Sequence, residues 1–555
     1  MEMTGGQALA QSLKIEGIDT IFGLPGIQLD FLFDAIWEEQ DHFAVHHTRH
    51  EQATAYMADG YARTTGRPGT FVVVPGPGLL NATAGLSTAW ACNSPVFCVT
   101  GQIDSGLIGQ DRGALHEIPD QLGLIRHLTK FAERASRPEE IPGIVRRAAR
   151  ELQTGRPRPV EVEVPPDVLG TVADVTLLEP ESWDRSELHQ ADPDLLEQAA
   201  QVLGQAERPL ICVGGGALSA QAWDEIAELA RLIEAPVLMT NNGRGVISDR
   251  DYHAQSGRVA TQELVPNADA VLVIGTRFLL AAGSGNAPAV RCNGTVIQAE
   301  IDPEEMGRNH AVDVPLLGDA RHTARELLAR VPGHNRSRES RERELTALQE
   351  AQRKAFDALP LQRDYARAIR DALPDDGIVV SESTQVGYLM QMGGYPVYEP
   401  RTFITSGYQG TLGYGFATAL GAQVGNPDRQ VVSVNGDGGF MYNVQELSTQ
   451  SQQQIPLITI VFNDNAYGNV RRIQQQRYGG RVIASDLKNP GFARLAELFD
   501  ISGYRANNPD ELRRSLARAV ERKEPALIEV PMPPTVDLPS PFPMQQLPPR
   551  PKLNL

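Results

Sequence analysis

The sequence predicts an α/β protein of three successive open sheets whose strands are mainly parallel. Short apolar runs rich in β-branched residues recur along the chain and end in Gly or Pro, and stretches with helical spacing separate them. Strands that are buried on both faces of a parallel sheet have this continuous apolar character, and crossover helices connect them. The runs gather in three blocks, at 70–167, 208–278 and 376–465.

Each block contains three such strand runs. In the first block, helical segments such as EQATAYMADGYART and PGLLNATAGLSTAWACN lie between or before the runs. The predicted strand runs are 70–78, 94–102 and 159–167, then 208–216, 235–243 and 268–278, then 376–384, 429–439 and 455–465.

Changes in composition mark the expected domain boundaries. An acidic, weakly periodic segment follows a Pro-Pro pair, and a second charged segment of low hydrophobicity indicates a linker or a solvated helix. The C-terminal tail is too rich in Pro for a helix interior, and we expect it to run extended over the surface or to form a lid. We predict domains at 1–168, 194–331 and 361–530, linkers at 169–193 and 332–360, and a tail at 531–555.

Composition excludes several classes of protein. The chain has 555 residues, of which 41% are hydrophobic, and 51 Lys and Arg against 69 Asp and Glu give a net charge of −18. So acidic a surface repels nucleic acid and anionic membranes. The four cysteines form neither a disulfide framework nor a CxxC zinc motif. Without a signal peptide or a long apolar run, we expect a cytoplasmic protein with no membrane partner.

The strongest chemical signal lies in the third block. One strand runs into the sequence Gly-Asp-Gly at 436–438, and the next strand ends in Asn-Asp-Asn at 463–465. Because 24 residues separate Gly438 from Asn463, one helix and one return strand fit between them. Both polar ends then lie at the carboxyl edge of the sheet, where open α/β folds bind ligands. Glycines at a helix start suit a phosphate, and Asp437 with neighbouring oxygens suits a divalent cation that bridges to a diphosphate.

At these residues the chain resembles the thiamine diphosphate enzymes of the pyruvate decarboxylase, acetolactate synthase and benzoylformate decarboxylase type. Their motif is GDG followed, after a similar spacing, by Asn-Asn, and this chain has Asp464 in place of the second Asn. The similarity continues in FGLPGIQLDFLFDAI, HHTRHEQATAYMADGYART, VVVPGPGLLNATAGLSTAW and TSGYQGTLGYGFATALGA. It implies a pyrimidine-binding, a middle and a diphosphate-binding domain, in that order.

The resemblance also implies a cofactor site, namely thiamine diphosphate held through Mg²⁺. Asp437, Asp464 and the backbone carbonyl of Ala466 would bind the metal. Leu412 would support the two rings of the cofactor, although a plain core leucine is the alternative. The remaining cofactor-binding residues that it implies are Pro25, Glu51, Gly76, Asn81, Ser383, Thr384, Gly410, Gly436, Gly438, Gly439 and Tyr467.

Glu51 is the principal catalytic candidate. By the resemblance, its carboxyl group faces the aminopyrimidine of the cofactor and favours the tautomer that deprotonates the thiazolium carbon. The alternative is an ordinary acidic residue in the first turn of a helix. Because Glu51 of one subunit meets the diphosphate site of another subunit in this family, a homodimer or homotetramer is implied.

The pocket residues favour carboligation over simple decarboxylation. Ile27, Val74 and Val470 are apolar where aldehyde-releasing decarboxylases place proton donors, so a carbanion formed by decarboxylation would add to an acceptor carbonyl. We therefore predict an acetolactate synthase-like enzyme that acts on a small 2-oxo acid or a diketone. His116 and Gln28 are further catalytic candidates in the substrate pocket; for His116 an ordinary surface histidine is the alternative.

Three other functions stay open at this stage. Within the family, the alternatives are a 2-hydroxyacyl-CoA lyase and a 2-oxo acid decarboxylase. A glycine turn after a strand, ICVGGGALS at 211–219, followed by Asp302, is compatible with FAD or ADP in the middle domain, or with a structural turn alone. The same turn raises the possibility of a nicotinamide-dependent dehydrogenase, although the third Gly of that fingerprint is missing.

Overall fold

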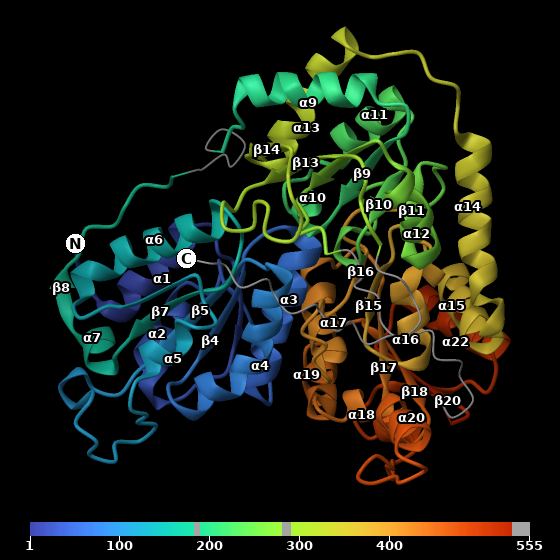
Figure 1. The fold of residues 1–555 in the computed structure, drawn as a ribbon. Helices are drawn as coiled ribbons and strands as arrows, with labels where there is room; N and C mark the ends of the chain where they lie inside the picture. Colours follow the sequence, from blue (N-terminus) through green and yellow to red (C-terminus); the bar gives the residue numbers. More distant parts are fainter. Residues whose placement is uncertain (182–188, 280–289, 535–555) are drawn as a thin grey trace. The chain divides into compact units, whose positions relative to one another are not determined.

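The computed structural model describes residues 1–181, 189–279 and 290–534, and Figure 1 shows its fold. Three six-stranded sheets, in which all strand pairs are parallel, account for most of its strands. The predicted fold class is therefore confirmed. The described residues divide into two compact units, one at 1–181, 367–388 and 401–534 and the other at 189–279, 290–366 and 389–400.

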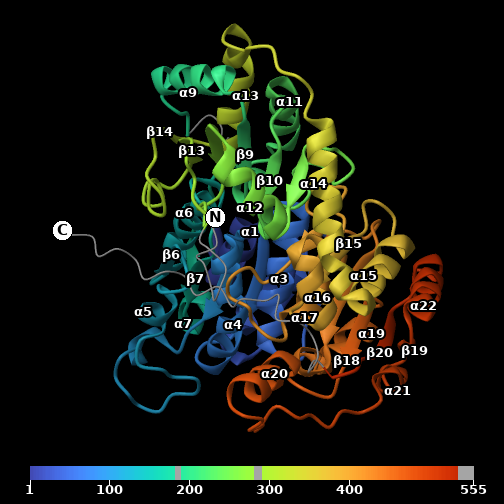
Figure 2. The same cartoon turned by 45° about the vertical axis from the view of Figure 1, so that its right-hand side comes forward.

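The first sheet belongs to the first unit and has the strand order β3-β2-β4-β5-β7-β6. Helices cover both of its faces, with α1, α2 and α6 over one hydrophobic cluster and α3 and α4 over the other (Figures 1 and 2). Its strands are β2 (Thr20–Gly23), β3 (Ala44–His47), β4 (Gly69–Val73), β5 (Val96–Gly101), β6 (Phe131–Arg134) and β7 (Val160–Val164).

The last sheet lies in the same unit and repeats this topology. Its order, β16-β15-β17-β18-β20-β19, is again second, first, third, fourth, sixth and fifth along the chain. In both sheets the strand order therefore reverses between the first strand and the third. The strands are β15 (Ile378–Ser381), β16 (Phe403–Ile404), β17 (Val431–Gly436), β18 (Ile458–Asn463), β19 (Ser502–Arg505) and β20 (Ala526–Pro531).

The middle sheet forms the second unit and has a different order, β11-β10-β9-β12-β13-β14. This is the arrangement of doubly wound nucleotide-binding folds. Its strands are β9 (Pro209–Val213), β10 (Val237–Met239), β11 (Ala254–Ser256), β12 (Ala270–Ile274), β13 (Thr295–Glu300) and β14 (Val314–Leu317).

The helices of the first unit lie before and after the middle domain in sequence. Those before it are α1 (Gly5–Ile15), α2 (Asp30–Glu38), α3 (Glu51–Thr65), α4 (Pro77–Cys92), α5 (Gln121–Ile125), α6 (Ile141–Gln153) and α7 (Pro166–Gly170). Those after it are α16 (Gln385–Leu389), α17 (Tyr414–Gly425), α18 (Asp437–Phe440), α19 (Leu447–Gln452), α20 (Gly468–Arg477), α21 (Phe492–Glu497) and α22 (Pro509–Arg522). The others are α9 (Pro193–Gln205), α10 (Gly215–Ser219), α11 (Trp223–Ile233), α12 (Gly257–Asn267), α13 (Ala320–Arg330), α14 (Glu342–Lys354) and α15 (Pro360–Ala372).

Helices α3 and α17 join the first and last domains in one hydrophobic core. Their backbones approach so closely that a Cβ atom on Gly60 would lie 1.9 Å from the carbonyl oxygen of Thr418. A Cβ atom on Gly421 would lie equally close to the carbonyl oxygen of Met57. Only glycine fits at these two positions, so the packing of the two domains depends on them.

The two predicted linkers contain regular structure. Strand β8 (Val172–Asp174) lies within 169–193 and pairs antiparallel with β1 (Glu2–Thr4). Helix α14 lies within 332–360. The predicted extended tail lies outside the described residues from 535 onward. Among the residues that are described, no helix has both the length and the apolar composition needed to cross a bilayer.

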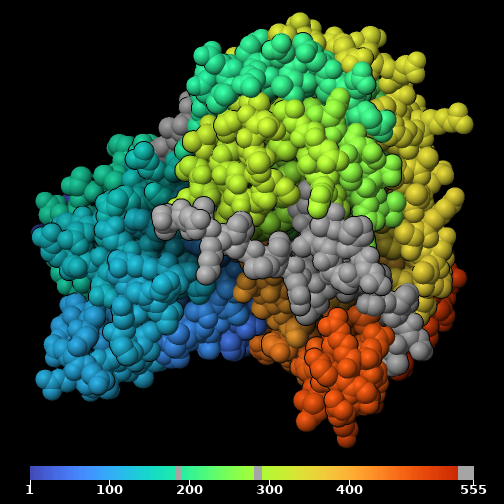
Figure 3. Space-filling model, viewed as in Figure 1, coloured from blue at the N-terminus to red at the C-terminus, as the bar shows by residue number. Residues whose placement is uncertain are grey.

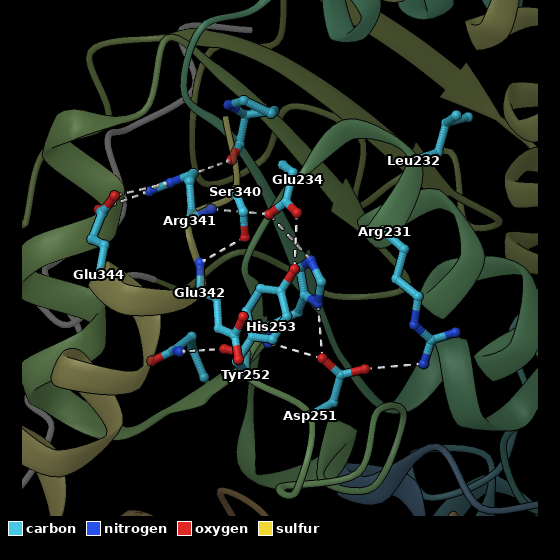
Figure 4. A network of polar contacts seen from close by, with 12 residues as sticks. Arg231, Leu232, Glu234, Asp251, Tyr252, His253, Ser340, Arg341, Glu342 and Glu344 are labelled. Atoms are coloured by element: carbon cyan, nitrogen blue, oxygen red, sulfur yellow. Dashed lines mark hydrogen bonds and ion pairs between the residues drawn. The ribbon is translucent and has the colours of Figure 1, made fainter. Parts of the chain in front are cut away.

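A polar network attaches the chain before α14 to the middle domain (Figure 4). Buried His253 contacts Asp251 through Nδ1 at 2.8 Å, and the Tyr252 hydroxyl donates to Glu234. Glu234 also accepts the backbone N–H of Arg341 at 3.2 Å. The hydrogen bond from His253 holds the pKa of Asp251 well below its usual range. Through Glu234, these contacts hold the segment that precedes α14 against the middle domain.

We expect Gly60→Ala to destabilise the first unit because the added methyl group overlaps the Thr418 carbonyl. Overpacking of this kind costs about 1–3 kcal/mol. Differential scanning calorimetry should show a lower unfolding temperature for this variant. Gly491→Ala is the matched control, since nothing lies within 4 Å of a Cβ atom there. Equal unfolding temperatures for the two variants would contradict the packing argument.

Candidate active site

Several of the candidate site residues lie at the two topological switch points of the first unit. In the first sheet, Pro25 and Gln28 follow β2, and Gly76 follows β4. In the last sheet, Ser383 follows β15 and Asp437 follows β17. Ligands of open α/β sheets bind at the carboxyl ends of strands where the order reverses. Strand topology thus selects the same two edges that the motifs indicated.

The register of β17 and β18 brings the predicted metal ligands together. Gly436 lies opposite Phe462, so Asp437 and Asp464 follow at adjacent strand ends. Their carboxyl groups are within hydrogen-bonding distance, and burial raises the pKa of both, with Asp464 further raising that of Asp437. Two buried carboxyl groups in contact are stable when they share a proton or bind a cation. A hard divalent cation fits this pair of oxygen ligands.

Neighbouring amides orient the two carboxylates. Asn489 Nδ2 donates to Asp437 at 2.6 Å, and Gln385 Nε2 donates to Asp464 at 3.0 Å. Neither amide was among the sequence-based candidates. Gln385 directly follows the candidates Ser383 and Thr384 in sequence, whereas Asn489 is distant from every predicted motif and is revealed only by the fold.

The backbone at Ala466 is shaped to present its carbonyl group. Asn465 adopts a left-handed conformation with φ 54°. Ala466 lies opposite Asp486 in an antiparallel bridge. Its two hydrogen bonds run from the Tyr467 N–H to Ser485 and from the Leu487 N–H to Asn465, so neither uses Ala466. The Ala466 carbonyl is therefore left outside the ladder, as a third oxygen ligand requires. Within the described ranges, no group of three or more His, Cys, Asp or Glu side chains could hold a metal ion, so a metal here needs such a carbonyl.

Glu51 is the first residue of α3, as the sequence predicted. Asn81 Nδ2 donates to its carboxylate at 3.0 Å, and a Cβ atom on Gly78 would lie 3.7 Å from it. Among the described residues, no hydrogen bond or ion pair joins the Glu51 side chain to the loops around Asp437. Within one chain, the Glu51 carboxylate therefore does not reach the diphosphate-binding loops, although Arg49 donates its N–H to Glu446 and Thr88 bonds Thr411 in the last domain.

Leu412 is not a core residue, since its side chain is 36% exposed. It lies between Gly410 and Gly413, which have φ 61° and 86° and turn the chain sharply on either side. This loop carries Leu412 to the surface of the unit just before α17. The position is compatible with a side chain that supports a ligand.

Glu382 is a buried acid that the sequence analysis did not single out. It is 1% exposed and accepts the backbone N–H of Gly413 through Oε1, while its Oε2 atom has no hydrogen-bond partner among the described residues. A Cβ atom on Gly439 would lie 2.3 Å from its Oε2 atom. Glu382 therefore ties the Leu412 loop to the GDG turn. Burial raises the pKa of Glu382 to about 7.

Ser383 and Thr384 lie next to this acid, at the start of α16. The Thr384 hydroxyl accepts the Gly387 N–H at 3.0 Å and so caps the helix. Across the turn, Tyr467 lies against the GDG segment, since a Cβ atom on Gly438 would be 2.7 Å from its ring. These residues surround the same helix start, where backbone N–H groups favour a phosphate.

A buried pair of hydrogen-bonded side chains, Gln121 and Glu163, supports the loop at Gly76. Gln121 Oε1 accepts the Gly76 N–H at 2.7 Å, and Gln121 Nε2 donates to Glu163 at 2.7 Å. Arg134 pairs with the same Glu163. The pattern VEVEV at 160–164 is the only sequence signal, because it places Glu161 and Glu163 on one face of a strand that is buried on both faces.

Gln28 and His116, the two candidates for the substrate pocket, lie near each other. Gln28 Nε2 donates to the carbonyl of Leu115 at 3.1 Å. His116 is half-buried with φ 70°, and its carbonyl oxygen would be 2.2 Å from a Cβ atom on Gly76. The apolar candidates differ in exposure, since Ile27 and Val470 are exposed and Val74 is buried.

The glycine turn of the middle domain has a structural explanation. A Cβ atom on Gly214 or on Gly216 would lie 2.6 Å from the backbone of Gly275. The turn thus allows the ends of β9 and β12 to pack together. Asp302 lies just after β13, and its backbone N–H bonds Glu300 at 3.2 Å.

Fold and site together are those of an α/β protein with a ligand-binding edge at the strand ends of its last sheet. Three family models match the chain, namely the N-terminal and C-terminal binding domains of thiamine pyrophosphate enzymes at 3–124 and 384–530, and their central domain at 196–327. Thiamine pyrophosphate is another name for thiamine diphosphate.

Similar proteins cover nearly the whole chain. A probable acetolactate synthase large subunit of Methanocaldococcus jannaschii is 33% identical, with 97% of this chain and 93% of the relative aligned. An acetolactate synthase of Arthrospira platensis is also 33% identical, over 95% and 94%. A probable 2-ketoarginine decarboxylase of Pseudomonas aeruginosa is 31% identical, over 95% and 94%.

The chain therefore belongs to the thiamine diphosphate enzymes, and its similarity is to the acetolactate synthase group. The predicted family and class of enzyme are confirmed. The central-domain model spans the glycine turn at 211–219, so the comparisons do not favour the dehydrogenase alternative.

We expect Glu382→Gln to change how stability depends on pH. The folded protein binds the Glu382 proton more tightly than the unfolded chain does, because its pKa is about 7 instead of 4.5. The gain in the free energy of unfolding is complete below pH 4.5 and is lost as the pH rises through 7. The free energy of unfolding changes by about 3 kcal/mol over this range. Scanning calorimetry from pH 4.5 to 8 should show wild type losing stability relative to Glu382→Gln. Exposed Glu497→Gln should follow wild type, and parallel curves for all three proteins would refute the assignment.

Proposed function

We propose that the protein is a thiamine diphosphate- and Mg²⁺-dependent carboligase or lyase that acts on a small 2-oxo acid or diketone, in the manner of an acetolactate synthase. The observation that carries this proposal is the pair of carboxyl groups at the ends of β17 and β18, buried Asp437 and half-buried Asp464. The near full-length similarity to acetolactate synthases supports the reaction type.

The residues present fit the cofactor and its metal. Asp437, Asp464 and the carbonyl of Ala466 would hold Mg²⁺. When bound, thiamine diphosphate would supply a nucleophilic carbon and an acceptor for the electron pair left by loss of CO2 from a 2-oxo acid. The backbone at the GDG turn would bind the diphosphate, and the residues assigned to the cofactor besides the metal ligands are Pro25, Gly76, Asn81, Ser383, Thr384, Gly410, Leu412, Gly436, Gly438, Gly439 and Tyr467.

Glu51 would hold and exchange a proton with the pyrimidine ring. Its hydrogen bond from Asn81 fixes the orientation of the carboxylate, and Gly78 leaves room beside it. Ile27, Val74 and Val470 offer no proton to a carbanion, which supports carboligation. His116 and Gln28 would contact the substrate.

A 2-oxo acid decarboxylase is the second candidate function. The similarity to a probable 2-ketoarginine decarboxylase favours it. His116 also provides a titratable group near the Gly76 loop. Product analysis separates the two functions, since a decarboxylase releases an aldehyde and a carboligase releases a ligated ketone. We assign no FAD or ADP to the middle domain, because contact with Gly275 accounts for its glycine turn.

We further propose that two subunits share each active site, in a homodimer or a larger homo-oligomer. Glu51 makes no hydrogen bond to the diphosphate-binding loops in the described part of its own chain. Several large apolar side chains on the loops of the last domain are exposed, and a second subunit would cover them; they are Tyr408, Leu412, Met441 and Tyr442.

Glu51→Gln should abolish turnover while cofactor binding persists. Loss of a general acid–base group lowers the rate by about 10²–10⁴-fold. The assay is CO2 release and ligated product from a panel of 2-oxo acids with added thiamine diphosphate and Mg²⁺, and calorimetry measures cofactor affinity. Exposed Glu139→Gln is the control and should behave as wild type. Full activity of Glu51→Gln would exclude the proposed mechanism.

Mixing two inactive variants tests whether the site is shared. Glu51→Gln and Asp437→Ala should each be inactive, since one lacks the acid and the other a metal ligand. If subunits share sites, a mixed dimer regains one intact site, and random exchange restores about a quarter of wild-type activity. If each chain forms its own site, every site stays defective. Activity that stays at the level of the separate variants after verified exchange therefore contradicts sharing.

A further inference from the structure

Gln28 carries a buried hydrogen-bond acceptor that has no partner within the described residues. The side chain is 7% exposed, and its Oε1 atom is buried without a hydrogen bond. Its Nε2 atom lies 3.1 Å from the carbonyl oxygen of Leu115, which can only accept. This contact fixes the orientation of the amide, so the unpartnered atom is the oxygen.

His116 presents a second unpartnered atom beside it. Its Nδ1 atom is buried and lacks a partner in the described chain. With φ 70°, His116 has a left-handed backbone that is rare for residues other than glycine and is concentrated at functional sites. Glu117 stabilises the loop before it, since its carboxylate accepts the N–H of Ala114 at 2.9 Å. The loop projects at the lower left of Figures 1 and 3 and is mostly exposed.

A chain of contacts links Gln28 and His116 to the loop that lies beside Glu51, the proposed proton-exchange residue. Gln28 bonds Leu115, and the His116 carbonyl lies against Gly76. Two residues later, Gly78 lies against the carboxylate of Glu51. All of these residues lie at the carboxyl edge of the first sheet, on the side where the substrate would meet the cofactor.

A buried acceptor without a partner is unfavourable, and a ligand that donates a hydrogen bond removes that cost. Resting on the proposed function, we infer that Gln28 and His116 form a subsite for the donor substrate, and that this 2-oxo acid bears a hydroxyl or N–H group on its side chain. A site built to bond such a group rejects the analogue that lacks it, by up to about 10⁴–10⁵-fold. Gln28 thereby determines specificity.

Three matched pairs of 2-oxo acids test this inference. They are 3-hydroxypyruvate with 2-oxobutanoate, 4-hydroxy-2-oxobutanoate with 2-oxopentanoate, and 2-oxoglutaramate with 5-methyl-2-oxohexanoate. In each pair an apolar group of similar size replaces the donor. With thiamine diphosphate and Mg²⁺ present, wild type should prefer the donor-bearing acid of at least one pair by tenfold or more in kcat/KM for CO2 release. Turnover without such a preference in any pair overturns the inference and leaves the proposed function standing, whereas no turnover with all six acids overturns both.

Variants then assign the preference to Gln28. Gln28→Met keeps the length of the side chain without the acceptor, and should reduce the preference to near unity through KM more than through kcat. Gln28→Glu keeps an acceptor and should retain part of the preference. Exposed Gln40→Met is the matched control and should behave as wild type. If the Gln28 variants do not fold, His116→Ala should still lower the preference; an unchanged ratio in every folded variant overturns the assignment.

Discussion

The contact between the Asp437 and Asp464 carboxyl groups is the constraint on which the candidate site depends. It follows from the parallel register of β17 and β18, which ends the two strands one residue apart. Each carboxyl group alone would be an ordinary strand-end acid. Together they form the proposed site for a cation, and Asn489 and Gln385 hold them in place. The diphosphate-binding role proposed for the GDG turn depends on that cation.

Two buried acids give this arrangement its rigidity. Glu382 accepts the N–H of Gly413 in the Leu412 loop and lies against Gly439 beside the GDG turn, and Glu163 reaches the Gly76 loop through Gln121. Both loops contain glycines with positive φ, whose backbone is otherwise free to move. Because the backbone N–H groups of Gly413 and Gly76 are the donors, these hydrogen bonds fix the path of the main chain in both loops. The same design thus appears on both halves of the site.

The sequence predicted the parts of the fold and site that depend on local patterns. The strand runs, the start of α3 at Glu51 and the spacing of Asp437 and Asp464 are all legible in residue order. Glu382, Gln121 and Asn489 were missed because their importance arises from burial and from partners distant in sequence. Strand order was equally hidden, since an apolar run does not say which neighbour it pairs with. The exposure of Leu412 also needed the fold, because a leucine before a helix is usually buried.

The first unit is discontinuous in sequence, and this affects how the protein is made. Gly60 of α3 packs on α17, which is translated roughly 350 residues later. At about 5–20 residues per second, a ribosome needs roughly 20–70 s to bridge that distance. During this time the small-residue face of α3 lacks its partner, while the middle domain emerges complete. Nascent chains therefore expose the apolar face of α3 that packs against α17 until α17 has been synthesised. We expect chaperones to bind the nascent chain at this helix.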